Sequence, residues 1–384
     1  MKNYFAIITI DKYPNRDAGS VRTRSLAKLL IQLGYEPIVI GMGPYTGGKY
    51  LEDGKVKYCS LRCKSNNIIS RVLGVFAFGI RVFFHLCNLG LDHISGLMFG
   101  SGSHILFRVL KIISKQRQIP LLYDCVEWYS PCEFNKGEQD YFYKKNNKLN
   151  SQLVDSNVSV ISISTYLDDY YKRKQINSIR IPVILDVKKI DYCIEKTSER
   201  IKIVYAGMPG KKDHLFEFLT AIQEIKHDIR NRLNVTVVGI GLETYEESYG
   251  KLDSDIIGNI VTFLGRKSRE ETMRIVRMSD FALLLRKSDE RYAKAGFPTK
   301  VVESMSLGTA MLCNLSSDLD MYLIDKENSI LIDECSVKAC KSSLRKLLAC
   351  TDKEIEAMKA NARKCAEENF DYSQYVESVQ QLIE

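Results

Sequence analysis

Short apolar runs alternate along the chain with segments whose apolar side chains recur at helical spacing. Residues 4–10 form an apolar run with β-branched side chains, residues 20–33 follow with helical periodicity, and residues 36–40 form a second apolar run. A strand, a helix and a second strand in this order make a βαβ unit with parallel strands. Further strands are predicted at 56–61, 96–99, 121–124 and 158–162, and further helices at 69–88, 104–115, 139–156 and 165–174. The pattern predicts a doubly wound α/β domain.

The alternation is interrupted once and then begins again. A polar, charged segment follows Pro182, and a new apolar run starts at residue 201. Beyond it, strands are predicted at 201–206, 235–238, 260–263, 281–285, 310–313 and 329–332, and helices at 213–229, 268–278, 299–307, 337–349, 353–369 and 372–383. We therefore predict an N-terminal domain over residues 1–186, a linker over 187–200, a second domain over 201–365, and a C-terminal helix over 366–384 that packs back on the first domain.

The strongest candidate binding site follows the predicted strand at 281–285. Gly296 allows a sharp backbone turn, Pro298 suits the first turn of a helix, and Gly308 suits its end. A loop that opens into a helix directs backbone N–H groups at one point, which favours a phosphate. Glu303 lies one helical turn further on, where a carboxylate accepts hydrogen bonds from ribose hydroxyls. The alternative for Glu303 is a carboxylate that caps a helix or forms a surface salt bridge.

Composition narrows the class of protein. A chain of 384 residues suits two domains, and its net charge of +8 suits anionic substrates such as nucleotide sugars, or an anionic membrane surface. No basic block interleaved with aromatic residues is present, so no nucleic acid partner is expected. The eleven cysteines have no CxxC spacing and the five histidines form no ligand cluster with them. We therefore expect no zinc site, no secretory signal and a reducing, cytoplasmic location.

Residues 68–91 are the most apolar segment of the chain. Arg71, Arg81, His85 and Asn88 interrupt it, whereas a membrane-spanning helix needs roughly 20 nearly uncharged residues. A helix that packs on a sheet is favoured over an interfacial membrane helix, and a spanning helix is not expected.

Motifs in the second domain follow the predicted strands in a fixed order. They include Gly207, the pair Lys211-Lys212 before a helix that contains Ala221, the Gly239–Gly241 turn, Gly265-Arg266, and the glycine–proline stretch. In this order and spacing they resemble the retaining glycosyltransferases of family 4. Residues 123–130 and 162–167 resemble the bacterial branch of that family that assembles surface polysaccharides. The resemblance covers nearly the whole chain and implies the GT-B fold, in which two Rossmann-like doubly wound domains face a central cleft and helices close the C-terminus.

The resemblance implies a role for residues of both domains. Glu303 is similar to the glutamate that grips the donor ribose, and Lys212 to the basic residue that neutralises the pyrophosphate, with Lys211 as the runner-up. Glu127 is the nearest polar candidate where the family often has a histidine near the donor sugar. Glu303, Lys212 and Glu127 form the predicted catalytic set. The predicted donor-binding set comprises Gly19, Lys211, Lys212, Gly239, Arg266, Gly296, Phe297, Pro298, Thr299 and Glu303.

Several positions admit a second interpretation. Ala295 stands eight positions before Glu303, where the family usually has another glutamate. Met208 follows Gly207 in the segment where the family usually has an arginine, which this chain lacks. Lys212 is alternatively a solvated surface lysine and Glu127 a residue of the domain rim. Arg22 and its neighbours Arg16 and Arg24 form either an acceptor-phosphate patch or, in preference, a solvated helix face.

The combined prediction is a metal-independent, retaining hexosyltransferase without a cofactor. Its donor is a nucleotide-diphosphate sugar, with a UDP-sugar preferred, and its acceptor is a glycan or lipid-linked glycan of capsule, O-antigen or exopolysaccharide assembly. The basic charge and the apolar helix at 68–91 suit the cytoplasmic face of the inner membrane. Two alternatives stay open: a non-catalytic partner protein of the same fold that binds glycan or another transferase, and a sugar-nucleotide epimerase.

Overall fold

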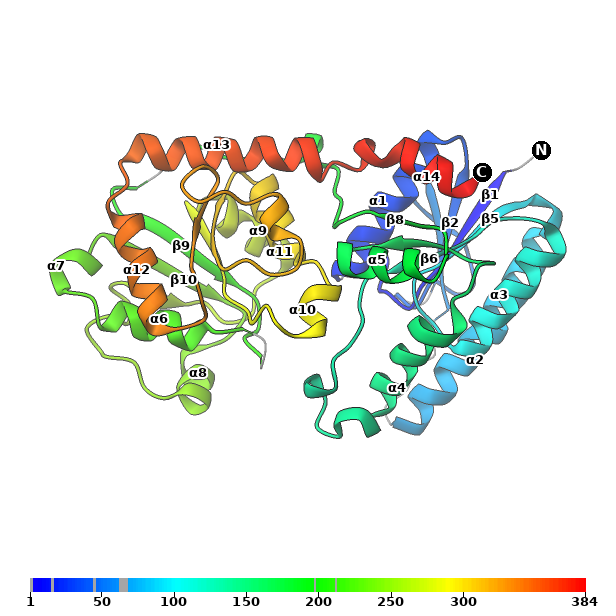
Figure 1. The fold of residues 1–384 in the computed structure, drawn as a ribbon, viewed down its shortest axis with the longest axis horizontal. Helices are drawn as coiled ribbons and strands as arrows, with labels where there is room; N and C mark the ends of the chain where they lie inside the picture. Colours follow the sequence, from blue (N-terminus) through cyan, green and yellow to red (C-terminus); the bar gives the residue numbers. More distant parts are fainter. Residues whose placement is uncertain (1–2, 15–16, 44–45, 62–67, 197, 211–212) are drawn as a thin grey trace. The chain divides into compact units, whose positions relative to one another are not determined.

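The computed structural model describes residues 3–14, 17–43, 46–61, 68–196, 198–210 and 213–384. The chain forms two compact units. The N-terminal unit comprises Met1–Asp186, Ala295–Phe297 and Tyr372–Glu384, and the C-terminal unit comprises Val187–Lys294 and Pro298–Asp371. Figure 1 shows the helices and strands of each unit along the chain.

An eight-stranded sheet with the order β3-β4-β2-β1-β5-β6-β7-β8 forms the centre of the N-terminal unit. The strands are β1 (Tyr4–Ile8), β2 (Glu36–Gly41), β3 (Leu51–Asp53), β4 (Val56–Ser60), β5 (Ile94–Phe99), β6 (Leu121–Cys125), β7 (Ser159–Ser162) and β8 (Ser178–Arg180). Only the β3–β4 pair is antiparallel among the described strands of this sheet. All residues of β1 are buried, as expected of a parallel strand between two helical layers.

Helices pack around this sheet in two groups. They are α1 (Ala18–Gln32), α2 (Ile68–Leu89), α3 (His104–Arg117), α4 (Tyr141–Lys148), α5 (Thr165–Arg173) and α14 (Val376–Ile383). Helix α1 contacts α14, whereas α2 lies beside α3 (Figure 1). Helix α2 buries Phe78, Val82 and Leu86, which lie one turn apart on one face. Among the described helices, none combines the length and the apolar character that crossing a membrane requires.

The C-terminal unit has a six-stranded, all-parallel sheet with the order β11-β10-β9-β12-β13-β14. Its strands are β9 (Ile201–Ala206), β10 (Leu233–Val238), β11 (Val261–Phe263), β12 (Phe281–Leu284), β13 (Ala310–Cys313) and β14 (Ser329–Leu331). Strand order runs outward from β9 in one direction and from β12 in the other. The boundary between β9 and β12 is therefore the topological switch point of the sheet, where parallel α/β sheets bind ligands.

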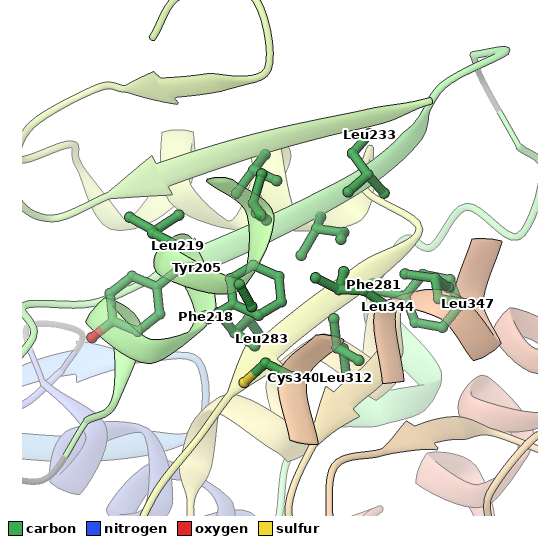
Figure 2. Close-up of a cluster of buried hydrophobic side chains, with 14 of the residues drawn as sticks. Tyr205, Phe218, Leu219, Leu233, Phe281, Leu283, Leu312, Cys340, Leu344 and Leu347 are labelled. Carbon is green, nitrogen blue, oxygen red and sulfur yellow. The ribbon is translucent and has the colours of Figure 1, made fainter. Parts of the chain in front are cut away.

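The described helices of the C-terminal unit vary in length from one turn to five turns. They are α6 (Leu215–Gln223), α7 (His227–Arg230), α8 (Leu242–Tyr249), α9 (Arg269–Arg277), α10 (Arg291–Ala295), α11 (Thr299–Ser306), α12 (Val337–Leu348) and α13 (Asp352–Asn369). Helix α6 contacts α12, and α11 contacts α9 and α13. Figure 2 shows Phe218 of α6 and Leu344 of α12 in the core, with Tyr205 at its edge and the Tyr205 hydroxyl directed away from the aliphatic side chains.

The predicted strands are confirmed, with their ends within two residues of the observed ones. The capping boxes that pair Ser268 with Glu271 and Thr351 with Glu354 hold the starts of α9 and α13. Gly308 follows the end of α11 with a φ of 76°, as predicted for a glycine at a helix end. Pro298 precedes the first helical residue rather than lying in the first turn.

Three predicted helices have the wrong extent. The helix predicted at 139–156 is α4 followed by a wider π-type turn, Leu149–Leu153, because the buried Asn150 accepts hydrogen bonds from Tyr123 and Tyr171. The helix predicted at 213–229 begins only at Leu215 and is interrupted before α7, since the side chain of Asp213 is engaged by residues of other loops. The helix predicted at 372–383 starts with a 3₁₀ turn and becomes α14.

Candidate functional site

A buried carboxylate, Asp213, collects three side chains at the carboxyl ends of β9 and β12. The hydroxyl of Tyr205 donates to Asp213 Oδ2 at 2.7 Å, and Nε of Arg286 donates to Oδ1 at 2.7 Å. Nζ of Lys300, in the first turn of α11, lies 3.8 Å from Oδ2. The side chain of Asp213 is only 5% exposed. We refer to Tyr205, Asp213, Arg286 and Lys300 as the Asp213 cluster. They connect the end of β9, the loops that follow β9 and β12, and the first turn of α11 at the switch point of the sheet.

Backbone pairing fixes the loops that carry this cluster. Asp213 and Arg286 form an isolated antiparallel bridge. Asn314, just after β13, accepts from the Arg286 N–H at 2.8 Å and donates from Nδ2 to the Arg286 carbonyl at 2.6 Å. The loop after β12 is thus held on both sides, and the guanidinium of Arg286 is aimed at Asp213 before any ligand arrives.

Two glycines make room for the cluster. Gly207 directly follows β9 with a φ of 153°, and a Cβ there would overlap Nζ of Lys300 and lie 2.8 Å from its Cε. The ammonium of Lys300 also lies 4.9 Å from the centre of the Tyr205 ring, a cation–π distance. Gly239, predicted as donor-binding, packs on Gly207, because its own Cβ would overlap the Gly207 carbonyl oxygen. The ends of β9 and β10 therefore approach as closely as glycines permit.

The electrostatics of the cluster favour a charged Asp213. Burial raises the pKa of Asp213, but Lys300, Arg286 and the hydrogen bond from Tyr205 outweigh that effect and lower the pKa below its ordinary value. Burial lowers the pKa of Lys300 and Arg286 lowers it further, against the opposing charges of Asp213 and Glu303. Burial and the neighbouring Asp213 raise the pKa of Tyr205 well above its ordinary value. One carboxylate and two cations leave the cluster with one surplus positive charge.

Glu303 lies one turn beyond Lys300 on α11. Its side chain is 11% exposed, and Nη2 of Arg269 donates to its Oε1 at 2.5 Å. Arg269 is the first residue of α9, so the capping box of that helix fixes the backbone from which its side chain extends. Within the described part of the chain, the second oxygen, Oε2, accepts no hydrogen bond. Glu303 therefore forms the salt bridge that its alternative interpretation predicted, through one of its two carboxylate oxygens.

The remaining predicted residues of the glycine–proline stretch straddle both units. Gly296 and Phe297 are grouped with the N-terminal unit, and Phe297 is buried. Pro298 and Thr299 belong to the C-terminal unit and start α11. Ala295, at the position of the absent glutamate, is fully buried.

Arg266, on the other side of the switch point, is exposed. Arg266 follows Gly265, whose carbonyl accepts the Gly239 N–H at 2.8 Å, and its exposed guanidinium lies 4.0 Å from the sulfur of Met208. Lys211 and Lys212 lie outside the described residues, so the basic role predicted for them stays a prediction.

In the N-terminal unit, Gly19 and Glu127 both neighbour Asp11. Gly19 lies in the first turn of α1, and a Cβ there would overlap the Asp11 carboxyl group. Burial raises the pKa of Asp11 to about 6, opposed by the hydrogen bond from Thr9 and reinforced by Asp17, Asp124 and Glu127. Two predicted site residues of this unit therefore share an acidic region at the ends of β1 and β6.

Arg22 is neither a phosphate patch nor a solvated residue. Its side chain is 4% exposed, and it donates to both oxygens of Asp124 at 2.8–3.0 Å. Arg24 pairs with Asp53 at 2.6 Å, and Arg16 lies outside the described residues. The arginine of α1 that faces inward neutralises a buried carboxylate, which a helical-spacing argument alone does not reveal.

Sequence reasoning missed Asp213, Arg286, Lys300 and Asn314 as site residues. Arg286 directly follows a predicted buried strand, and Lys300 stands inside the glycine–proline stretch. Those positions were the available signal, since residues after parallel strands gather at one edge of a sheet. Their convergence on Asp213, however, depends on loop conformations that no local pattern encodes.

Residues 188–365 match the family model described as "Glycosyl transferases group 1". A comparison with curated protein sequences gives no match. Among solved structures, sucrose-phosphate synthase from Thermosynechococcus elongatus has a TM-score of 0.74 at 14% identity and 99% and 98% coverage of this chain and that one. HepE from Anabaena, in complex with UDP and glucose, has 0.68 at 13% identity, with 98% of both chains covered.

WaaG, a glycosyltransferase involved in lipopolysaccharide biosynthesis, has a TM-score of 0.68 at 14% identity, with 99% of both chains covered. At identities this low, the structural similarity establishes the fold and not the substrate. The two doubly wound units and the C-terminal helices make this chain a GT-B protein, which confirms the predicted fold class.

Proposed function

We propose that this protein is a retaining glycosyltransferase that uses a nucleotide-diphosphate sugar, with a UDP-sugar as donor. The observation that carries the proposal is the match of residues 188–365 to the group 1 glycosyl transferases, in the unit that holds Glu303 and the Asp213 cluster. The similar fold of HepE, whose structure contains UDP and glucose, supports a uridine nucleotide.

In the proposed reaction, the bond between the sugar C1 and the diphosphate oxygen breaks while the acceptor hydroxyl bonds to C1 on the same face. The hydroxyl proton passes to the departing phosphate, and UDP leaves. Negative charge develops on the diphosphate, where the surplus positive charge of the Asp213 cluster and the N-terminus of α11 stabilise it. Glu303 Oε2 accepts from a ribose hydroxyl. No nucleophile of the protein is needed, unlike in most retaining glycosidases.

Lys212 and Glu127 complete the proposed site. Lys212 would add positive charge near the diphosphate, and Glu127 would accept from a sugar hydroxyl. The exposure of Glu127 in the N-terminal unit supports a contact with substrate, and its carbonyl oxygen is held by Asn146 at 3.2 Å and Asn150 at 3.1 Å. With cations of the chain placed to neutralise the diphosphate, we propose transfer that needs no metal ion.

For the acceptor we propose a lipid-linked or growing surface glycan, reached at the cytoplasmic face of a membrane. Helix α3 supports this, because one exposed stripe carries Ile105, Arg108, Ile112 and Lys115. Both isoleucines are more than half exposed. Phe84 of the neighbouring α2 is 60% exposed, and the two helices contact each other. Alternating apolar and basic side chains on one surface suit an anionic lipid headgroup region.

The experiment that tests the function is a donor panel. Binding of UDP- and GDP-sugars is followed through the thermal stability of the protein, and turnover through UDP release with and without glycan acceptors, in the presence and absence of EDTA. We expect one UDP-sugar to stabilise the protein and to be turned over equally with EDTA, and NMR of the product to show the donor's anomeric configuration.

Other outcomes contradict the proposal in different ways. Nucleotide binding without turnover on any acceptor favours a non-catalytic partner protein, which Ala295 and Met208 motivate. Conversion of the free donor without an acceptor identifies an epimerase. A protein that binds no nucleotide sugar is not a donor-dependent enzyme of any of these kinds.

A further inference from the structure

We propose that Lys300 and Arg286, oriented by Asp213, form the anchor that holds and neutralises the diphosphate of the donor. This inference rests on the proposed function, which supplies the diphosphate. It assigns the principal cationic contact to side chains of the α11 start and of the loop after β12, whereas the sequence predicted that contact at Lys212 or Lys211.

Lys300 and Arg286 lie where a sheet of this topology binds its ligand. Lys300 Nζ packs on Gly207, so the ammonium lies at the very end of β9. Arg286 comes from the loop that leaves the adjacent strand, β12. Both cations therefore stand at the switch point, where the crossovers leave in opposite directions and an open α/β sheet offers space to a ligand. Glu303, the proposed ribose contact, is one helical turn away on the same helix.

The two cations carry more positive charge than Asp213 neutralises. A buried carboxylate needs one cation for neutrality, yet Asp213 has two. The Asp213 side chain is 5% exposed, whereas the side chains of Lys300 and Arg286 are 29% and 27% exposed. The carboxylate is thus sealed inside while part of each cation faces outward. An arrangement with surplus positive charge and a covered counter-ion fits an incoming polyanion rather than a purely structural ion pair.

The positions of both cations are fixed by neighbouring side chains. Oδ2 of Asp213 accepts a hydrogen bond from Tyr205 and pairs with the ammonium of Lys300, and Oδ1 accepts a hydrogen bond from Arg286. The two oxygens therefore set the directions of both cations. Asn314 holds the backbone of Arg286 from the far side. Asp213 is a positioning residue in this scheme, and it does not touch the diphosphate. Charges fixed in advance stabilise developing negative charge without reorganisation during the reaction.

The test compares UDP with uridine by isothermal titration calorimetry, since only UDP carries the diphosphate. The variants are Lys300→Met, Lys300→Arg, Lys212→Met and the control Lys353→Met, which removes an exposed lysine of α13. We expect Lys300→Met to weaken UDP binding roughly 10- to 100-fold, as for a lost charged hydrogen bond, and to leave uridine binding unchanged. Lys300→Arg should retain most of the UDP affinity, and Lys353→Met all of it.

Each contrary result has a separate meaning. UDP affinity that is unchanged in Lys300→Met, or a loss confined to Lys212→Met, overturns the anchor while the proposed function stands. Equal losses for UDP and uridine also overturn it, because they indicate a merely structural lysine. A wild-type protein that binds no UDP overturns the proposed function itself.

A second variant displaces the ammonium without removing it. Gly207→Ala places a methyl group where Lys300 Nζ now lies, so UDP affinity should fall while uridine affinity persists. Gly258→Ala is the matched control, since Gly258 also has a positive φ, 77°, but a Cβ at that position would meet no atom within 4 Å. Full UDP affinity in a folded Gly207→Ala protein contradicts the anchor.

Discussion

Four carboxylates of this chain differ in whether a cation is paired with them. Asp213 and Asp124 are paired with cations and buried, and are committed to structure or positioning. Glu303 is paired through one oxygen only, and among the described residues Asp11 forms no salt bridge and lies near other carboxylates. Two predictions about single residues follow from this difference.

The first concerns Glu303. Replacement by alanine removes the proposed acceptor for the ribose hydroxyl, so UDP binding should weaken by roughly 1.5–3 kcal/mol in a calorimetric titration. Arg269→Ala is the control, because it breaks the same salt bridge but keeps the carboxylate. If Glu303 were only a partner for Arg269, neither variant would change the affinity for UDP.

The second concerns Asp11, whose pKa burial raises from 3.8 to about 6. Below pH 4 both the folded and the unfolded state hold the proton. Between pH 4 and 6 the unfolded state loses it first, so stability falls as the pH rises, and above pH 6 the folded state buries a charge. Asp11→Asn should therefore raise the free energy of unfolding at pH 7 by about 1–3 kcal/mol and have little effect at pH 4.

Thermal unfolding followed by circular dichroism between pH 4 and 8 measures this difference. Asp320→Asn, which changes an exposed carboxylate, is the control. A stabilisation by Asp11→Asn that is the same at both ends of the pH range would contradict a buried, titrating Asp11.

Among the helices and strands, α3 shows how one element serves two environments. Leu106, Phe107, Leu110 and Ile113 face the core, while the stripe from Ile105 to Lys115 faces solvent. An isolated exposed isoleucine needs no explanation, but two on one stripe with basic residues between them do. The membrane-bound acceptor that we propose would account for this stripe if the protein associates with a membrane surface.

We therefore expect the protein to co-sediment with vesicles of anionic lipid and not with neutral ones, and the binding to weaken as salt is added. Ile105→Glu combined with Ile112→Glu should abolish the binding, because it places charges in the lipid interface. Met321→Glu changes an equally exposed apolar residue of the C-terminal unit and should bind as the wild type does. Vesicle binding that survives the double change would exclude this stripe.

Across the molecule as a whole, the first unit is built from segments that lie far apart in the sequence. Tyr372–Glu384 belongs to the N-terminal unit, and Val379 and Leu382 of α14 are buried in the core that contains Leu26 and Leu30 of α1. The N–H of Tyr372 donates to the Leu185 carbonyl at 2.9 Å. The core of the first unit therefore depends on residues that follow the second unit in the sequence.

Leu382→Ala should lower the stability of the N-terminal unit by about 2–5 kcal/mol, the usual cost of a cavity in a core. Hydrogen exchange should accelerate in β1 and β2, and exchange in β9 and β12 should be unchanged. Gln381→Ala, at the exposed neighbouring position, should leave both units as they are. Faster exchange throughout the chain would show that the two units do not unfold independently.

Much of the fold and part of the site were accessible from the sequence. Strands such as β9 and β12 were predicted because parallel strands are continuous apolar runs. The helix at 268–278 was predicted as well, and the capping box of Ser268 and Glu271 that begins it is formed by residues close together in the sequence. The extents of the helices predicted at 139–156 and 213–229 were wrong, because Asn150 and Asp213 form hydrogen bonds with side chains distant in the sequence. Glu303 was identified as a candidate, but its salt bridge with Arg269 was not specified.

Local patterns were enough to predict the alternation of strands and helices, the restart after residue 200, and the glycine–proline stretch that opens α11, because each depends on periodicity or on the backbone preferences of a few adjacent residues. Which charges meet is known only from the folded chain. Asp213 is far from Arg286 and Lys300 along the chain, and the parallel sheet brings the loops after β9 and β12 and the start of α11 to one edge. Ion pairing is selected by distance and burial in three dimensions, and neither is written in the local sequence.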